Sequence, residues 1–449
     1  MRSVRYYAMS ALLAWGMTLL PLPFSSTVSA IDIPEWIDED NLSRHMDHLA
    51  RLPRPPATET EFAAGAYVEE VLRSYGYQTS LQPFYYYTYQ KPSTLSFQVE
   101  GVQMGWNPYG LTYGPNGVGT ARIVNSGQGT AADFENGKAR GNIAFVQRGA
   151  IPFAEKVRQA AAAGAVAVVI GNDREGEWKG TLNEPLDMSV PVIALSKEEG
   201  LLLQKLLQAN EKLKATVKVE GSYSSKQTSA NFVATRKPTQ GGTGQIVMVT
   251  AHHDSVPYSP AANHGAAGLA VLLELARTMA ERPIDTEIRF VSLGAISAGE
   301  KGAGAYVNSL SAGEKERIIA SYSLDGVGSE DAGDLLVTTA QRTKNLPVEL
   351  AEKAGARFST AAKDQVSGYR EDRTLALAGI PTALITRPPV NQLRNQAEDT
   401  REKISLEQLS KAAQLMFTAI TKITDTSTSA YTRGNDKMPE QKLEAEEEI

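Results

Sequence analysis

Apolar residues recur at helical spacing in an early segment of the chain. From position 58 to 76 they return every three or four residues, which predicts one amphipathic helix. Thr58 and Glu61 have the spacing of a capping box at its start, and Gly76 suits the position just after its end. A strand is expected next, near 78–84.

The segment 96–222 contains a strand–helix–strand pattern. A buried strand is expected at 142–146, a helix at 153–163 with Gly164 as its stop, and a second buried strand at 165–170. Two strands joined through a helix in this way predict a right-handed crossover.

A further strand and helix complete this segment. The strand is expected at 190–195 and the helix at 198–207. Ser196 and Glu199 form a second capping box at the helix start.

Strands and helices alternate through 229–425. The expected elements are strands at 245–250, 287–293, 322–324 and 381–386, and helices at 266–280 and 406–423. Such alternation predicts an α/β fold with a largely parallel sheet that helices cover on both faces. Ligand-binding groups then belong at the carboxyl ends of the strands.

Length and charge limit the classes of protein that this chain can represent. Its 449 residues are too many for one ordinary core and suit two domains. The net charge of −6 offers no basic face, so no nucleic-acid partner is expected. The chain has no cysteine, so no disulfide stabilises it.

Both ends of the chain differ in composition from the rest. Arg2 and Arg5 precede an apolar run at 8–20, and small residues end at Ala30, which predicts a signal peptide at 1–30. We therefore expect a secreted or cell-surface protein without a stable membrane span after cleavage, the alternative being an uncleaved anchor. The acidic tail at 426–449 is expected to be disordered.

Residues 96–222 contain motifs of a known insert. They are Gly141-Asn142-Ile143-Ala144-Phe145-Val146-Gln147-Arg148-Gly149, the segments 153–157 and 160–170, and Val190-Pro191-Val192-Ile193. With these motifs, 96–222 resembles the protease-associated (PA) domain. In that family such domains are non-catalytic inserts that bind substrates or partners or cover the active site.

Short motifs at expected strand ends and helix starts carry a second resemblance. They are Ala251-His252-His253-Asp254-Ser255, Asn263-His264-Gly265, Leu324-Asp325, Ala378-Gly379-Ile380-Pro381 and Glu398-Asp399-Thr400. With them, 31–95 and 223–425 together resemble the co-catalytic zinc aminopeptidase family, which includes leucyl aminopeptidases, glutamate carboxypeptidases and the transferrin receptor. The resemblance implies one discontinuous domain with a mixed, largely parallel sheet, interrupted by the β-rich α/β insert.

Active members of this family hold two metals with two histidines and three carboxylates, of which one bridges the metals. A further glutamate acts as general base and takes a proton from metal-bound water. In this chain His252 matches the first histidine ligand, and Asp325 matches a metal-ligating aspartate. Asp254 matches the residue that orients the histidine.

The remaining functional positions are replaced. The bridging aspartate falls at His264, which cannot bridge two metals through two oxygens. The family's paired glutamates fall at Ile296 and Ser297, so the general base and one ligand are missing. The last histidine falls at Asn395, and none of the five histidines lies after position 264. The resemblance therefore assigns no catalytic residue.

Two interpretations of the surviving residues stay open. His252, His264 and Asp325 could hold a single zinc, since two histidines and a carboxylate are a recognised ligand set. Otherwise the two histidines are leftover polar groups that form hydrogen bonds around Asp254 and Asp325. Glu300 is the one nearby carboxylate that could replace the lost pair.

We therefore expect an exported, non-hydrolytic relative of the aminopeptidases that binds peptides or a protein partner through the former cleft and the insert. The alternatives are a single-zinc metallopeptidase of the aminopeptidase type, or a sound fold with no retained ligand. For the other histidines we expect structural roles. His45 and His48 are expected on a surface face of the first helix, and His253 is expected to pack against neighbouring residues rather than bind a metal.

Overall fold

The computed structural model describes residues 36–176, 180–360, 371–389, 393–427 and 430–431. The predicted signal peptide at 1–30 and most of the predicted acidic tail lie outside these residues. Within the described ranges, no helix has both the length and the apolar composition that a membrane crossing requires.

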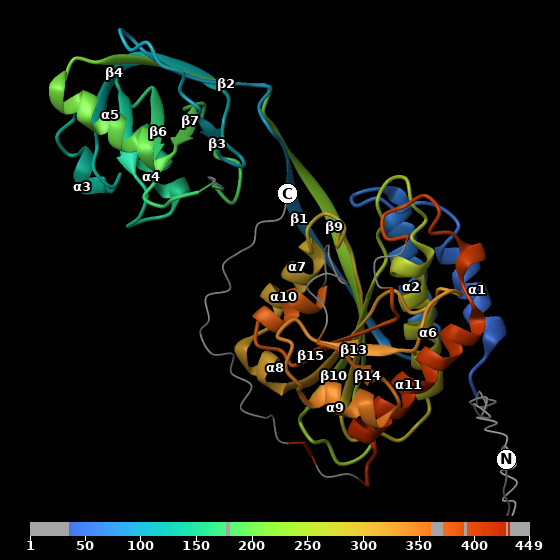
Figure 1. Cartoon of the computed structure of the whole chain (residues 1–449). Helices are drawn as coiled ribbons and strands as arrows, with labels where there is room; N and C mark the ends of the chain where they lie inside the picture. Colours follow the sequence, from blue (N-terminus) through green and yellow to red (C-terminus); the bar gives the residue numbers. More distant parts are fainter. Residues whose placement is uncertain (1–35, 177–179, 361–370, 390–392, 428–429, 432–449) are drawn as a thin grey trace, which may run out of the picture.

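The described residues form two sheets, which Figure 1 shows as two separate bodies. Across the eight-stranded sheet the order is β1 (Gln78–Gln90), β9 (Tyr223–Arg236), β11 (Glu287–Leu293), β10 (Ile246–His252), β12 (Ile318–Leu324), β15 (Thr382–Thr386), β13 (Leu336–Thr338) and β14 (Arg357–Phe358). Across the seven-stranded sheet it is β2 (Thr94–Val99), β8 (Lys214–Glu220), β4 (Gly117–Asn125), β5 (Ile143–Gln147), β6 (Ala167–Gly171), β7 (Val192–Leu195) and β3 (Tyr109–Gly110).

The centre of the larger sheet is parallel, as the sequence predicts. Strands β11, β10, β12 and β15 pair in parallel, whereas β1 with β9, β9 with β11 and β13 with β15 pair antiparallel. Every residue of the four central strands is buried. Burial on both faces explains why these strands appear in the sequence as continuous apolar runs.

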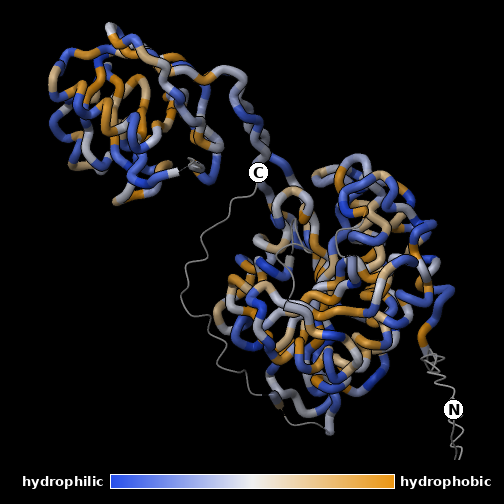
Figure 2. The backbone as a smooth tube through the Cα atoms, viewed as in Figure 1, coloured by the Kyte–Doolittle hydropathy of each residue, from blue (hydrophilic) through white to orange (hydrophobic). Residues whose placement is uncertain are grey.

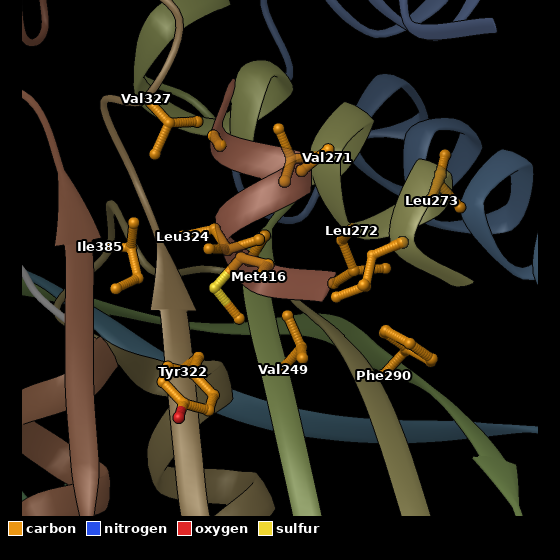
Figure 3. Packing of buried hydrophobic residues seen from close by; sticks show 14 of the residues in the cluster. Val249, Val271, Leu272, Leu273, Phe290, Tyr322, Leu324, Val327, Ile385 and Met416 are labelled. Atoms are coloured by element: carbon orange, nitrogen blue, oxygen red, sulfur yellow. The ribbon is translucent and has the colours of Figure 1, made fainter. Parts of the chain in front are cut away.

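Helices cover both faces of the larger sheet. One face carries α1 (Glu39–Leu49), α2 (Glu59–Ser74), α6 (Ala267–Met279), α9 (Leu346–Lys353) and α11 (Leu406–Thr424). The other carries α7 (Lys301–Ser309) and α10 (Glu371–Leu377). Side chains from α6, α11 and the central strands point toward one another in Figure 3. Figure 2 shows hydrophobic segments gathered inside both bodies.

A two-stranded ribbon joins the two bodies. Strands β1 and β9 pair along their whole length, from Gln78 opposite Thr235 to Gln90 opposite Tyr223. Only the 232–236 part of β9 also pairs with β11. The rest of the ribbon runs from the larger sheet to the smaller one (Figure 1). The strand expected at 78–84 is therefore too short, because β1 continues into the ribbon.

The smaller sheet lies between two apolar clusters. On one side α5 (Lys197–Ala209) packs against it, and on the other α4 (Phe153–Ala162) does. The Ser196 and Glu199 capping box is confirmed, because each side chain meets the other's backbone N–H. The chain passes from the ribbon into this sheet at residues 91–93 and returns at 221–222.

Two expectations about the first helices are wrong. Thr58 does cap α2, but the Glu61 carboxylate does not return to Thr58; it accepts hydrogen bonds from Ala57, Ser229 and Ala295 instead. His45 is buried rather than on a surface face, and its Nδ1 lies 2.8 Å from the Tyr67 hydroxyl. Burial lowers the pKa of His45 to about 4.

Candidate functional site

The polar residues singled out in the sequence meet at one edge of the larger sheet. His252 ends β10, Asp325 directly follows β12, and Ala295–Ser297 follow β11. Because these strands are parallel and adjacent, their carboxyl ends share one edge. His264 joins them from the turn Ala262–Ala266, labelled η1, which leads into α6.

The turn η1 is held in an unusual backbone conformation. Ala261 has φ 48° and Gly265 has φ 133°. A Cβ atom on Gly265 would lie 3.2 Å from Cε1 of His252, so glycine allows the turn to approach the end of β10. Left-handed conformations at non-glycine residues persist where surrounding contacts fix them, and they gather at functional sites.

Asp399 supplies such contacts. Its carboxylate accepts hydrogen bonds from the backbone N–H groups of Asn263 at 2.7 Å and His264 at 3.2 Å. Burial raises the pKa of Asp399, while His264 and these two N–H groups oppose that rise. The imidazole of His264 is thereby directed across the end of β12, where its Cε1 would meet a Cβ on Gly326 at 3.2 Å.

Asp254 is bound mainly by backbone groups. Its carboxylate oxygens accept hydrogen bonds from the N–H groups of Ile296 at 2.9 Å and Ser297 at 2.8 Å. His252 donates through Nδ1 to the Asp254 carbonyl at 3.1 Å, and Nδ1 lies 3.4 Å from the carboxylate. Burial alone would raise the pKa of Asp254, but His252 and the Ser297 amide outweigh it and hold that pKa well below its usual value.

Asp325 is bound by side chains. His264 donates through Nδ1 to Oδ1 at 3.2 Å, and the Arg394 guanidinium pairs with Oδ2. Burial acts to raise the pKa of this carboxyl, but Arg394 and His264 hold it well below the usual range. Sequence reasoning missed Arg394. The one available signal was its place beside Asn395, where the family has its last histidine.

The other positions that the resemblance marks as replaced also have definite surroundings. The Ile296 side chain is buried in an apolar cluster with Leu293 and Tyr306. Asn395 is exposed to solvent. Glu300 has φ 56° and accepts a hydrogen bond from the Thr374 hydroxyl. His253 is buried, with Nδ1 2.9 Å from the Ser292 hydroxyl and its ring edge-on to Phe232.

A buried carboxyl group lies behind this edge. Glu61 Oε1 accepts hydrogen bonds from the Ala295 N–H and the Ser229 hydroxyl, both at 2.8 Å. Burial, together with the nearby charge of Asp254, raises the pKa of Glu61 to about 7. Sequence reasoning placed Glu61 in a helix cap and missed this contact, because the partners lie 168 and 234 residues away.

A cavity of about 410 Å³ opens beside Glu61. Its apolar walls come from α2, β1 and β9, and His253 also lines it. The apolar lining residues are Ala57, Phe62, Ala63, Leu81, Pro83, Ala230 and Phe232. The cavity is therefore adjacent to the loop 295–297 that follows β11.

Comparisons with known proteins agree with this architecture. Residues 231–420 match peptidase family M28, and residues 118–203 match the PA domain. An aminopeptidase of Aneurinibacillus sp. strain AM-1 has a similar structure, with 36% identity and a TM-score of 0.57. The similarity covers 88% of this chain and 96% of that one. The chain belongs to peptidase family M28.

Other similar proteins extend the comparison. A zinc aminopeptidase of Bacillus subtilis, BSAP, shows 28% identity and a TM-score of 0.55 over 89% of this chain and 97% of that one. Aminopeptidase YwaD of B. subtilis is 36% identical over 67% of this chain, and a Pseudomonas aeruginosa aminopeptidase is 31% identical over 68%. The matched parts span 66% and 61% of those two proteins, which is less than two thirds of their lengths.

The family resemblance implies zinc, but the residues of this M28 chain do not fit it. Zinc requires deprotonated nitrogen and oxygen ligands arranged about one point. Here both carboxylate oxygens of Asp325 are engaged, Oδ1 by Nδ1 of His264 and Oδ2 by the Arg394 guanidinium. In the part of the chain that the structure describes, no three His, Cys, Asp or Glu side chains are grouped to hold a metal ion.

Proposed function

We propose that this chain is a non-hydrolytic member of family M28 that binds peptide segments without cleaving them. One observation carries the proposal: the general-base position is occupied by Ile296, whose hydrocarbon side chain is buried among apolar neighbours. A hydrocarbon cannot accept a proton from an attacking water. Two nearby carboxylates are engaged elsewhere, because Asp254 binds backbone N–H groups and Glu300 accepts a hydrogen bond from the Thr374 hydroxyl.

The cavity beside Glu61 gives this proposal a binding site. Its volume suits one large side chain, and mostly apolar walls with few polar groups are typical of ligand pockets. Phe62 and Leu81 are half exposed on its rim, so an entering apolar side chain would cover them. The occupant we propose is therefore an aliphatic or aromatic side chain of a peptide whose backbone lies along the former cleft.

Hydrolysis and binding can be measured on the same preparation. We expect no turnover of leucine p-nitroanilide, with or without added zinc, and saturable binding of a labelled peptide with leucine at its N-terminus. Phe62→Asp should weaken that binding about tenfold or more, since it places a charge in an apolar pocket. Leu201→Asp is the matched control, because Leu201 is as exposed as Phe62 but lies in the insert.

Metal-dependent turnover that copurifies with the chain would overturn the non-hydrolytic assignment. Equal peptide binding by wild type and Phe62→Asp would show that the cavity is not the binding site. It would not bear on the proposed loss of the general base.

The alternative is a single-zinc hydrolase that uses His252, His264 and Asp325. One observation favours it: His264 and Asp325 are in direct contact, and His252 is close enough to Asp325 to influence its pKa. Zinc-dependent turnover that His264→Ala abolishes would establish this alternative.

We also propose an extracytoplasmic location. One relative supports this proposal by its name, the probable lipoprotein aminopeptidase LpqL of Mycobacterium tuberculosis. It is 27% identical to this chain, and the match covers 82% of this chain and 78% of that protein. N-terminal sequencing of the protein secreted by a bacterial host should show a chain that begins at Ile31; a chain that still begins at Met1 would contradict cleavage.

A further inference from the structure

We propose that the Arg394 guanidinium replaces a metal ion as the resident cation of Asp325 and prevents zinc from binding at this edge of the sheet. The inference rests on the proposed loss of the family's metal centre and names the residue that now fills its electrostatic role.

A cation is needed because Asp325 is buried and ionised. A buried carboxylate without a positive partner is strongly destabilising, and metal ions supply that partner in metalloproteins. In this chain Arg394 pairs with Oδ2, and His264 donates to Oδ1. Asp325 is thus satisfied by side chains of the chain itself.

Other positive charge near the site is already committed. Arg54 is buried, and its Nε and Nη1 donate to the backbone carbonyls of His253 at 2.8 Å and Pro260 at 2.6 Å. Arg387 is also buried, with its guanidinium bound to the carbonyls of Val327 and Gly333. Arg394 is therefore the guanidinium that compensates Asp325.

The backbone of the loop explains how Arg394 enters the site. Leu393 has φ 64° and Asn395 has φ 56°, so the chain turns on both sides of residue 394. This conformation sends the Arg394 side chain inward and leaves Asn395 exposed. The cation thus comes from the loop in which the family resemblance expects the last histidine ligand, one residue earlier.

The guanidinium is committed to this ion pair. Its Nη2 faces Asp325, while its Nε is buried and has no hydrogen-bond partner among the described residues. A zinc ion on Asp325 would have to displace Arg394 and leave a half-buried guanidinium without its counter-charge. Zinc would also have to compete with the proton that His264 Nδ1 donates to Oδ1.

The test compares zinc binding by wild type and variants after exhaustive treatment with EDTA. Arg394→Met removes the charge but keeps much of the side-chain volume, and Arg394→Lys keeps the charge. Arg401→Met is the matched control, because Arg401 pairs with the exposed carboxylate of Asp47 rather than with Asp325. Zinc per chain is measured by equilibrium dialysis with elemental analysis, and circular dichroism verifies that each variant is folded.

We expect Arg394→Met to bind about one zinc per chain, at least tenfold more tightly than wild type, Arg394→Lys or Arg401→Met. The gained binding should disappear in Arg394→Met/His264→Ala, which would locate the ion at this site. If Arg394→Met is unfolded, Arg394→Gln provides the same neutral test.

Equally tight, stoichiometric zinc binding by wild type would overturn the inference, and so would a folded Arg394→Met that binds no zinc. These outcomes differ from a failure of the proposed function. Wild type that binds zinc but shows no turnover would overturn the role of Arg394 and leave the non-hydrolytic assignment intact. Turnover by zinc-free wild type would overturn the non-hydrolytic assignment and leave the role of Arg394 intact.

Discussion

Asp254 and Asp325 are both buried aspartates at neighbouring strand ends, yet their partners differ in kind. The Asp254 carboxylate accepts from the backbone N–H groups of Ile296 and Ser297, whereas Asp325 accepts from the side chains of His264 and Arg394. A backbone N–H is present whatever side chain the residue carries, so these contacts of Asp254 do not depend on the residue types at positions 296 and 297. A carboxylate that is bound by side chains depends on the identity of those side chains.

Removing Asp254 should have the largest effect. Asp254→Ala leaves two backbone N–H groups without their acceptor and takes a negative charge away from buried Arg54. We expect the free energy of unfolding to fall by about 3–5 kcal/mol, measured by urea denaturation. Asp47→Ala removes a surface carboxylate and should cost less than about 1 kcal/mol. Similar losses in the two variants would contradict a structural role for Asp254.

Glu61 extends the comparison, because two backbone N–H groups and the Ser229 hydroxyl bind it, and no Lys or Arg among the described residues forms an ion pair with it. Its pKa is about 7 in the folded protein, against 4.5 as the ordinary value. Between pH 4.5 and 7 the folded protein keeps a proton that the unfolded chain has released. This group therefore lowers the free energy of unfolding as the pH rises through that window, by about 3 kcal/mol in total, and has no further effect above it.

Glu61→Gln cannot titrate, so the difference in unfolding free energy between wild type and variant should change across that window and be flat above pH 7. The comparison cancels the contributions of His45 and His253, whose pKa values burial lowers to about 4 and about 3. A constant difference from pH 4.5 to 8 would mean that Glu61 is ionised throughout.

The Asp325–Arg394 pair should show a smaller, specific coupling. Asp325→Asn and Arg394→Met each leave one buried partner unbalanced, while the double variant removes both charges. A double-mutant cycle in urea should give a coupling of about 1–3 kcal/mol. The same cycle for Asp47 and Arg401 on the surface should give about 0.5 kcal/mol or less. A coupling near zero at Asp325 would show that Arg394 does not compensate it.

Local patterns predicted much of the fold. The parallel central strands, α6, α11 and the Ser196 cap follow from apolar runs and capping spacing, which are properties of adjacent residues. The length of β1 was predicted too short because its pairing partner β9 lies more than a hundred residues later in the sequence. The pattern of apolar and polar residues within β1 does not reveal that partner.

Other contacts needed the folded chain. Arg394 and Asp325 are 69 residues apart in the sequence. The direction of the Arg394 side chain depends on the positive φ angles of Leu393 and Asn395, which no pattern in the sequence predicts. The burial of His45, by contrast, could have been predicted from the sequence. Leu42, Met46 and Leu49 define the buried face of α1, and position 45 lies on that face at i+3 from Leu42.

The most direct measurement is a crystal structure of the wild-type protein grown with excess zinc, with anomalous data collected at the zinc absorption edge. Our account predicts no anomalous peak beside Asp325 and a guanidinium from Arg394 on its carboxylate. A peak bound by His252, His264 and Asp325, with Arg394 turned away, would contradict the replacement of the metal by arginine.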